Sequence, residues 1–86
     1  MKTRQKYFVY ILKCRDKTLY SGMTNDLIKR ELQHNSGKGS AYVRSRGGGK
    51  IIYSEIVKSL SVALKREAQI KKMSREAKLL LTKAGK

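Results

Sequence analysis

Glu67 is the first side chain in this sequence whose surroundings suggest chemistry. Only six of the 86 residues are Asp or Glu. Glu67 falls at the centre of the apolar stripe of a predicted helix, a stripe made by Leu60, Ala63, Leu64 and Ile70. A buried carboxylate is costly unless it is paired with a cation or bound to a metal. An ion pair with Lys71, one helical turn later, or a side chain that reaches past the core to water explains Glu67 without a metal, and periodicity alone favours that explanation.

Arg30 and His34 form the second candidate site, on a helix predicted from about Asn25 to about Asn35. They are four residues apart, so they are neighbours on the helix surface. The planar guanidinium of Arg30 can donate two parallel hydrogen bonds to a phosphate. His34, the only histidine, could act as acid, base or phosphate donor. We predict Ile28 and Leu32 as the core face, which puts Arg30 and His34 on the opposite side, where a solvated helix face is the alternative.

Tyr10 and Tyr20 lie on two predicted strands, Tyr7–Cys14 and Leu19–Thr24, that form a hairpin. A two-residue turn at Asp16-Lys17 would place the tyrosines on opposite faces. A three-residue loop from Asp16 to Thr18, or one bulge, would place them on the same face. The residues do not decide between these turns, and strand tyrosines are more often core residues than catalytic ones.

The composition excludes several other kinds of site. One histidine and one cysteine leave no multi-histidine metal cluster, no cysteine-based zinc site and no internal disulfide. The Gly-rich segment 36–50 has no GxxxxGK[ST] spacing and is therefore not a P-loop. Two-metal phosphoryl transfer needs clustered carboxylates. Any metal here would be a single ion with few protein ligands.

The elements that position these side chains are predicted in the order β-β-α-β-α-α. The strand Tyr7–Cys14 is apolar on both faces, which is typical of a central strand covered on both sides. The elements after the first helix are a basic Gly-rich loop (36–50), a third strand (Ile51–Lys58), a second helix (Ser59 or Ser61 to about Met73) and a third helix (Ser74 to Gly85). We expect one α+β domain over residues 1–86, with helices packed on a three-stranded sheet.

The charge of the chain points to its partner. It has 21 Lys and Arg against 6 Asp and Glu, a formal net charge of +15. Such a charge opposes a compact state unless a polyanion neutralises it, and nucleic acid is the commonest polyanion. A membrane surface is less favoured, because the sequence has no lipidation motif and no apolar stretch near the ~20 residues that span a bilayer. A solvated basic surface is the alternative without a partner. The single cysteine, Cys14, lies in an apolar run and fits a buried thiol in a reducing, cytoplasmic setting.

The ordered set of these residues resembles the GIY-YIG nuclease domain. The matching strings are Phe-Val-Tyr-Ile-Leu-Lys-Cys, Leu-Tyr-Ser-Gly-Met-Thr, Leu-Ile-Lys-Arg-Glu-Leu-Gln-His-Asn and Ala-Leu-Lys-Arg-Glu-Ala-Gln-Ile-Lys-Lys. They extend from about Lys6 to Leu81. The chain is most similar to the small stand-alone bacterial members of that superfamily.

The resemblance implies a metal-dependent phosphodiesterase that cuts nucleic acid with a divalent ion such as Mg²⁺ or Mn²⁺. It implies that Tyr10 assists or activates the attacking water and that Tyr20 orients water or phosphate. Arg30 would bind the scissile phosphate and stabilise its developing charge. Glu67 would hold the single metal ion, and His34 would support the base or the phosphate.

The resemblance also implies a shared cleft. Both tyrosines and Arg30 would face it, which favours the longer hairpin loop or the bulge, and Gly22 would let the strand end approach the site closely. The basic residues expected to flank this cleft and hold the nucleic-acid backbone are Lys29, Lys38, Arg44, Arg46 and Lys50.

The sequence departs from the family pattern in ways that shape the expected function. Phe8 stands where the family name has Gly, and Ser21 where it has Ile. Larger members use an Asn well after the Glu, but the only asparagines here, Asn25 and Asn35, precede Glu67. No targeting domain is apparent. We therefore expect structure-directed or weakly specific cleavage, of DNA more than RNA, with a protein partner as a possible source of specificity. The alternative is a nucleic-acid-binding module with the same fold and little or no cleavage activity.

Overall fold

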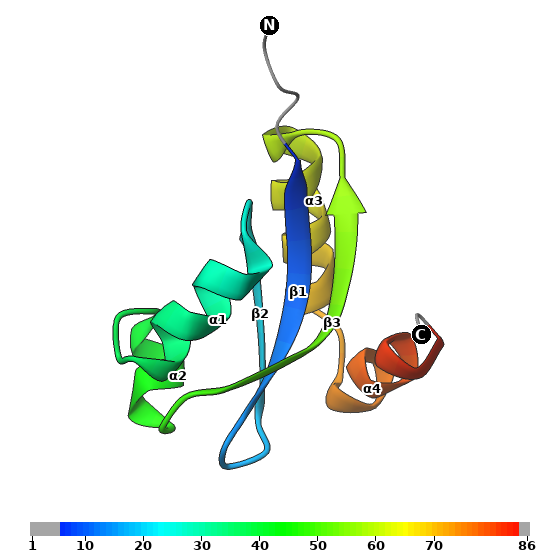
Figure 1. Cartoon of the computed structure of the whole chain (residues 1–86). Helices are drawn as coiled ribbons and strands as arrows, with labels where there is room; N and C mark the ends of the chain where they lie inside the picture. The colour runs from blue at the N-terminus through cyan, green and yellow to red at the C-terminus, as the bar shows by residue number, and fades with distance from the viewer. Residues whose placement is uncertain (1–5, 85–86) are drawn as a thin grey trace, which may run out of the picture.

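The computed structural model describes residues 6–84, which form a three-stranded antiparallel sheet with four helices (Figure 1). The strands are β1 (Tyr7–Cys14), β2 (Leu19–Thr24) and β3 (Gly49–Val57). The helices are α1 (Leu27–Asn35), α2 (Ala41–Ser45), α3 (Leu60–Lys71) and α4 (Arg75–Ala84). The strand order is β2-β1-β3. The predicted α+β class and the central position of the first strand are both confirmed.

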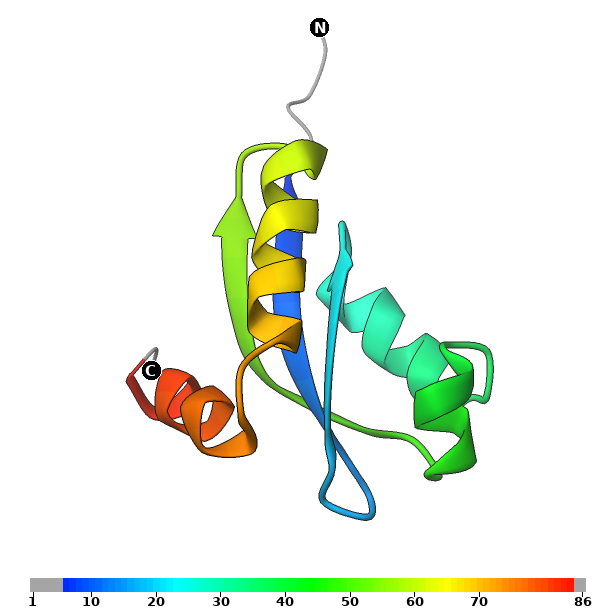
Figure 2. The same ribbon diagram turned by 180° about the vertical axis from the view of Figure 1, so that it is seen from behind.

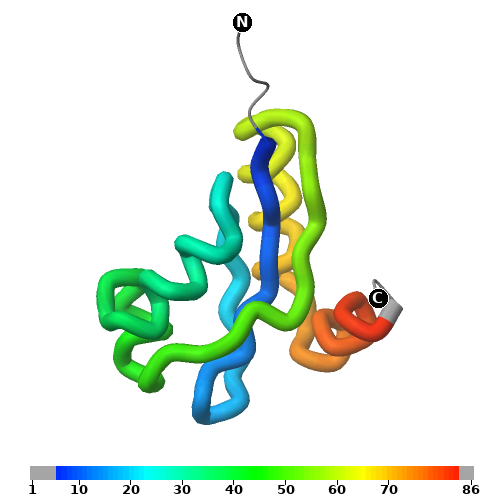
Figure 3. Tube along the Cα trace, viewed as in Figure 1, coloured from blue at the N-terminus to red at the C-terminus, as the bar shows by residue number. Residues whose placement is uncertain are grey.

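Alternate residues of β1 point into two separate cores. Val9 and Ile11 are fully buried on the face that α3 covers, where they pack with Ala63 and Ile70. Tyr10 and Leu12 are fully buried on the other face, with Val43 of α2 and with Leu27 at the start of α1. Figure 2 shows α3 in front of β1, and Figure 3 shows the chain passing from α1 and α2 into β3. The sheet therefore separates α3 from the pair α1 and α2.

The β1–β2 hairpin resolves the question of the two tyrosines. Tyr10 lies opposite Gly22, and Leu12 lies opposite Tyr20. This register places Tyr10 and Tyr20 on the same face, as the family resemblance predicts. The loop has three residues and consists of Arg15, Asp16 and Lys17, with Lys17 in the left-handed region at φ 73°. The expected loop length is correct, but the loop begins one residue earlier than predicted.

The prediction of a loop over residues 36–50 is wrong in its middle and at its end. Ala41–Ser45 forms the short helix α2, because the Ser40 side chain caps it by accepting a hydrogen bond from the Val43 N–H. Gly47 and Gly48 end this segment at φ +80° and +88°, which favours glycine. β3 begins at Gly49 rather than at Ile51. This short helix was not predicted from the sequence, because the glycines and charges of segment 36–50 are typical of a loop.

The predicted core face of α1 is also wrong. Ile28 is 78% exposed and Leu32 is mostly exposed, whereas His34 is only 1% exposed. Asp26 caps the helix by accepting from the Lys29 N–H, so the helix begins at Leu27, two residues later than predicted. The inward face is set by the hydrogen bond between His34 Nε2 and the Tyr10 hydroxyl of the sheet, and this orientation turns the two apolar side chains to solvent.

On α3 the predicted stripe is partly correct. Ala63 and Ile70 are buried, and Glu67 lies mostly buried on the same face, but Leu60 and Leu64 are about half exposed. The predicted caps Ser59 and Ser74 are both present at the starts of α3 and α4. The expected stop at Gly85 lies outside the described residues. Within residues 6–84, none of the helices combines the length and the apolar character needed to cross a membrane.

Ser21 offers a test of the core on the α3 side. It is buried, and its Oγ has no hydrogen-bond partner among the described residues. A buried hydroxyl without a partner costs about 1–3 kcal/mol. We expect Ser21→Ala to raise the free energy of unfolding by about 1 kcal/mol in urea denaturation. Ser36→Ala, which removes an exposed hydroxyl bonded to the Gln33 carbonyl, should give no such gain. A less stable S21A would contradict the assignment.

Candidate functional site

The candidate site is built around the hydroxyl of Tyr10. This oxygen lies 2.9 Å from His34 Nε2 and 3.4 Å from Arg30 Nε, which donates to it. Tyr10 comes from the central strand, and the other two residues come from α1 one helical turn apart. The structure thus brings together three of the predicted residues. It places Arg30 and His34 on the inner face of α1 rather than on the predicted outer face.

The pKa of His34 determines which of its ring nitrogens carries a proton in this cluster. Burial, and to a smaller extent the charge of Arg30, lower the pKa of His34 below its ordinary value of 6.5. The ring is therefore neutral at pH 7. A neutral ring can accept the Tyr10 O–H at Nε2 only if its own proton is on Nδ1. Nδ1 is buried and has no hydrogen-bond partner among the described residues.

The Tyr10 phenol is neutral as well. Burial raises its pKa above 10, the hydrogen bond and charge of Arg30 lower it in part, and smaller contributions from Tyr20 and Glu67 raise it. The contribution from Glu67, which belongs to the helix on the other face of the sheet, is the smallest of these. Tyr10 has no exposed surface, so its hydroxyl meets solvent only when a neighbour moves.

Two glycines make room for this cluster. A Cβ at Gly22 would lie 2.6 Å from the Tyr10 hydroxyl oxygen and 2.8 Å from its Cζ. A Cβ at Gly39 would collide with Nδ1 of His34. A glycine at position 22 therefore lets β2 approach the Tyr10 hydroxyl closely. Gly39 was not identified from the sequence, because one glycine among many in segment 36–50 carries no distinguishing signal.

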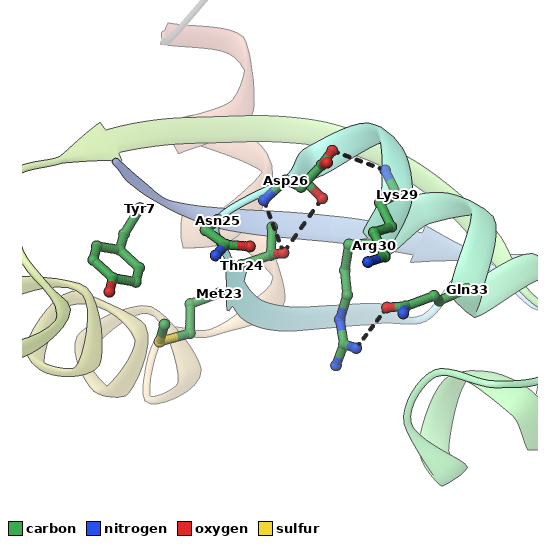
Figure 4. A pocket seen from close by; sticks show the side chains of 8 residues that line it. All are labelled: Tyr7, Met23, Thr24, Asn25, Asp26, Lys29, Arg30 and Gln33. Atoms are coloured by element: carbon green, nitrogen blue, oxygen red, sulfur yellow. Dashed lines mark hydrogen bonds between the residues drawn. The ribbon is translucent and has the colours of Figure 1, made fainter. Parts of the chain in front are cut away.

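Arg30 reaches from the cluster to the surface. It lines an open groove of about 430 Å³ together with Tyr7, Met23, Thr24, Asn25, Asp26, Lys29 and Gln33 (Figure 4). Its guanidinium donates to Gln33 Oε1 at 3.1 Å. No carboxylate is bonded to it among the described residues. The guanidinium thus keeps donors free for an anion such as phosphate.

Glu67 forms the ion pair that requires no metal. Its Oε2 lies 3.3 Å from Lys71 Nζ, one helical turn later. Among residues 6–84, no group of three or more His, Cys, Asp and Glu side chains could hold a metal. A lone carboxylate still fits one Mg²⁺ or Mn²⁺ ion, because Mg²⁺ often keeps several waters and takes its other ligands from substrate phosphates. The residues fit a single, weakly held ion.

Tyr20 connects the cluster to a ring that sequence reasoning missed. The centroid of Tyr20 is 5.5 Å from that of His34 and 6.4 Å from that of Tyr10. On its outer side Tyr20 stacks on Tyr42 at 5.7 Å, and the Arg46 guanidinium carbon lies 3.8 Å from the Tyr42 centroid. An aromatic residue within a strongly basic segment was the available signal for Tyr42.

The predicted basic residues do not flank one cleft. Lys29 shares the groove with Arg30. Lys38 and Arg44 are exposed on the segment around α2, and Arg46 covers Tyr42. Lys50 lines a separate groove with Lys13, Arg15 and Lys17, so its predicted place beside Arg30 is wrong. The error follows from treating residues 36–50 as one loop, whereas β3 carries Lys50 away.

Neither asparagine supplies the late Asn of larger family members. Asn35 bridges α1 to the start of β3: its Nδ2 donates to the carbonyls of Glu31 and Gly49, and its Oδ1 accepts from the Gly49 N–H. Its amide is fully used in holding the fold together. Asn25 lines the groove near Arg30 but comes from the start of α1. The candidate site therefore contains one carboxylate, Glu67, and lacks the late Asn of larger family members.

A family model and the sequences of known proteins match this chain over most of its length. The family model described as the GIY-YIG catalytic domain matches residues 6–79. A UPF0213 protein of Syntrophus aciditrophicus is 58% identical over 79 residues, which are 91% of this chain and 91% of the relative. A UPF0213 protein of Staphylococcus saprophyticus is 42% identical over 80 residues, covering 93% of this chain and 98% of the relative.

Two solution NMR structures share the fold. That of the UPF0213 protein of Bacillus halodurans has a TM-score of 0.58 and 35% identity, covering 92% of this chain and 84% of that one. That of a protein from E. faecalis has a TM-score of 0.60 and 31% identity, covering 96% of this chain and 90% of that one. Similarity thus extends over nearly all of the described chain.

The pKa of His34 tests the geometry of the cluster. His34 is the only histidine, so its ring signals in an NMR titration are unambiguous. We expect a pKa below 6.5, moving up but staying below 6.5 in Arg30→Gln, because burial is the larger cause. Arg44→Gln, at an exposed residue of α2, is the matched control and should change nothing. Titration at or above 6.5 in the unaltered chain would refute the buried Tyr10–His34 pair.

The lowered pKa of His34 also predicts how the stability of the fold changes with pH. Unfolding restores the ordinary pKa of His34, so the unfolded chain binds the proton more readily. The contribution of this group to stability is complete above pH 6.5 and is lost as the pH falls through the lower pKa of the folded state. Urea denaturation at several pH values, with His34→Gln as reference, measures this loss.

Proposed function

The chain belongs to the GIY-YIG family, and on that premise we propose that it is a metal-dependent endonuclease that hydrolyses phosphodiester bonds in nucleic acid. The observation that supports this most strongly is the Tyr10 hydroxyl held between His34 Nε2 and Arg30 Nε. DNA is the proposed substrate ahead of RNA, with structure-directed or weakly specific cutting. The single free thiol, Cys14, is buried, and we propose a cytoplasmic location.

The proposed reaction begins with Arg30 binding the scissile phosphate. Its free donors face an open groove, and a cation placed there stabilises the charge that develops on the phosphoryl oxygens. Lys29, in the same groove, supports the binding of the backbone. When Arg30 moves toward the phosphate, it leaves the Tyr10 hydroxyl that it otherwise contacts at 3.4 Å.

Tyr10 then acts on water through His34. The phenol gives its own proton to His34 Nε2 along their hydrogen bond, and its oxygen accepts a proton from the attacking water. The water oxygen forms the new bond to phosphorus as the bond to the leaving oxygen breaks. His34 is too buried to touch the phosphate, so of its two predicted roles we propose support of the base. Tyr20, edge-on to the His34 ring and tilted against the Tyr10 ring, keeps both in place.

Glu67 would hold the divalent ion. When bound, Mg²⁺ or Mn²⁺ supplies a Lewis acid that stabilises the leaving oxygen. Lys71 competes for the same carboxylate, so binding of the ion must displace this i,i+4 ion pair, whose lysine is exposed and whose carboxylate is mostly buried. A helical pair of this spacing is worth about 0.5 kcal/mol, which makes the displacement feasible.

Removal of the two charged groups is the direct test. We expect Arg30→Ala and Glu67→Ala each to lower the rate of nicking by about 100-fold or more in Mg²⁺ or Mn²⁺. Substrates are branched, flapped and plain DNA. Glu76→Ala, an exposed carboxylate of α4, is the matched control and should keep the activity. Lys71→Ala should reach half-maximal rate at lower metal concentration. Cleavage that survives Arg30→Ala or Glu67→Ala would falsify the proposal.

The phenol has a test of its own. We expect Tyr10→Phe to lower the nicking rate by about 100-fold, because it removes the hydroxyl but keeps the ring in the core. Tyr53→Phe removes a hydroxyl on the opposite face of the sheet, where it is bonded to Glu55, and should leave the rate unchanged. Equal rates for Tyr10→Phe and the unaltered chain would show that Tyr10 only packs.

The alternative, a binding module without turnover, is favoured by one observation: Glu67 is already paired with Lys71. That alternative predicts no metal-dependent nicking by any variant, with binding that weakens steeply with salt and is indifferent to Glu67→Ala. Nicking that depends on metal and on Glu67 rejects it.

A further inference from the structure

Tyr42 and Arg46 make a flat, partly exposed surface at the outer edge of the candidate site, which we call the stacking platform. We propose that this platform stacks on an unpaired nucleobase, so that the preferred substrate has an unpaired nucleotide beside the phosphate to be cut. The inference rests on the proposed function for its choice of ligand, nucleic acid. Its test needs binding only, without cleavage.

The platform is continuous with the site through its rings. Tyr42 stacks on Tyr20 with an interplanar angle of 28°, and Tyr20 in turn contacts the rings of Tyr10 and His34. On Tyr42 the Arg46 guanidinium carbon lies 3.8 Å from the ring centroid, the distance of a stacked contact. A base on this platform is therefore one ring removed from Tyr20.

The platform is fixed before any ligand arrives. Arg46 Nε lies 3.2 Å from Asp16 Oδ2 of the hairpin loop. Its Nη1 donates to Ser45 Oγ at 3.1 Å and to the Tyr42 carbonyl at 3.4 Å. A guanidinium held from its edges keeps its plane parallel to whatever stacks on it, which lowers the entropy lost on binding.

Core packing does not account for Tyr42. The ring is 39% exposed, and its neighbour Val43, fully buried, is the residue that packs α2 against the sheet. The Arg46 side chain is also 31% exposed. A tyrosine capped by arginine at the surface of a chain with net charge +15 is a surface on which a base can stack.

An unpaired base is the ligand that this geometry selects. Bases stack on aromatic side chains and on arginine planes when their own faces are free, as in single strands, loops and flaps. In a continuous duplex both faces of each base are covered by its neighbours. The platform therefore discriminates by structure and not by sequence, because every base has a π face.

The test measures binding in EDTA, where no metal-dependent cleavage can occur. A short fluorescein-labelled DNA is used as a single strand and as a blunt duplex, and affinity is measured by anisotropy. We expect Tyr42→Ala to weaken single-strand binding about tenfold and duplex binding by less than about twofold. Tyr42→Phe, which keeps the ring, should bind both like the unaltered chain.

A second pair of variants separates the plane from the charge. Arg46→Lys keeps the charge and loses the plane, and should lose the preference for single strands. Arg44→Lys makes the same change at an exposed residue of α2, two positions before Arg46, and should keep the preference for single strands. A single abasic position, moved along the single strand, should at one register reproduce the loss and make Tyr42→Ala harmless.

The outcomes distinguish the two proposals. Equal losses on single strand and duplex, in Tyr42→Ala and Arg46→Lys alike, overturn the platform; the NMR signal of His34 in each variant reports whether the site stays folded. If Tyr42→Ala removes the single-strand preference and no chain nicks DNA, the platform is supported and the proposed hydrolysis fails. If nicking depends on Glu67 but Tyr42→Ala weakens binding to single strand and duplex equally, the stacking platform is refuted and the proposed hydrolysis is supported.

Discussion

The hydrogen bond between the Tyr10 hydroxyl and His34 Nε2 decides how α1 packs on the sheet. Both groups are buried, and a buried polar group left without a partner costs more than an exposed apolar side chain does. The helix therefore turns His34 and Arg30 inward and leaves Ile28 and Leu32 in solvent. Glu31 adds to the same orientation, because its Oε2 accepts from the Ile51 N–H at 2.7 Å. The helix is held by polar contacts as much as by its apolar surface.

On the other face, a salt bridge fixes the rotation of α3. Arg66 makes two hydrogen bonds to Glu55 of β3, at 2.8 and 2.7 Å. The hydrogen bonds and charge of Arg66 are the main reason that the pKa of Glu55 is lowered. Glu67 follows Arg66 and lies 100° further around the helix. With Arg66 anchored on β3, Glu67 takes a different direction from the helix axis, pairs with Lys71, and makes the smallest contribution to the raised pKa of Tyr10.

The parts of this structure that follow from apolar periodicity were predictable. The alternation in β1 gave both cores, and Ala63 and Ile70 gave the buried face of α3. The parts decided by polar contacts were not: no apolar count shows that α1 buries a histidine, or that Ser40 begins a helix in a Gly-rich segment. The site residues were predicted from their order along the chain, which resembles that of a known family. Local periodicity could not predict them, because residues that are distant in sequence can share one cluster without forming any local pattern. Tyr42 was not predicted as a site residue for the same reason, because the tyrosine on which it stacks, Tyr20, is 22 residues earlier.

The burial of Tyr10 connects these contacts to the proposed reaction. In the free protein Arg30 lies against the phenol, and its charge helps to lower the pKa of His34. In the proposed reaction, a phosphate that attracts Arg30 would neutralise that charge and open the phenol to water in the same movement. His34 then becomes a better proton acceptor at the moment when Tyr10 can receive a proton from water. In the proposed reaction one residue both covers the base and recognises the phosphate, so the base would be exposed only when substrate is bound.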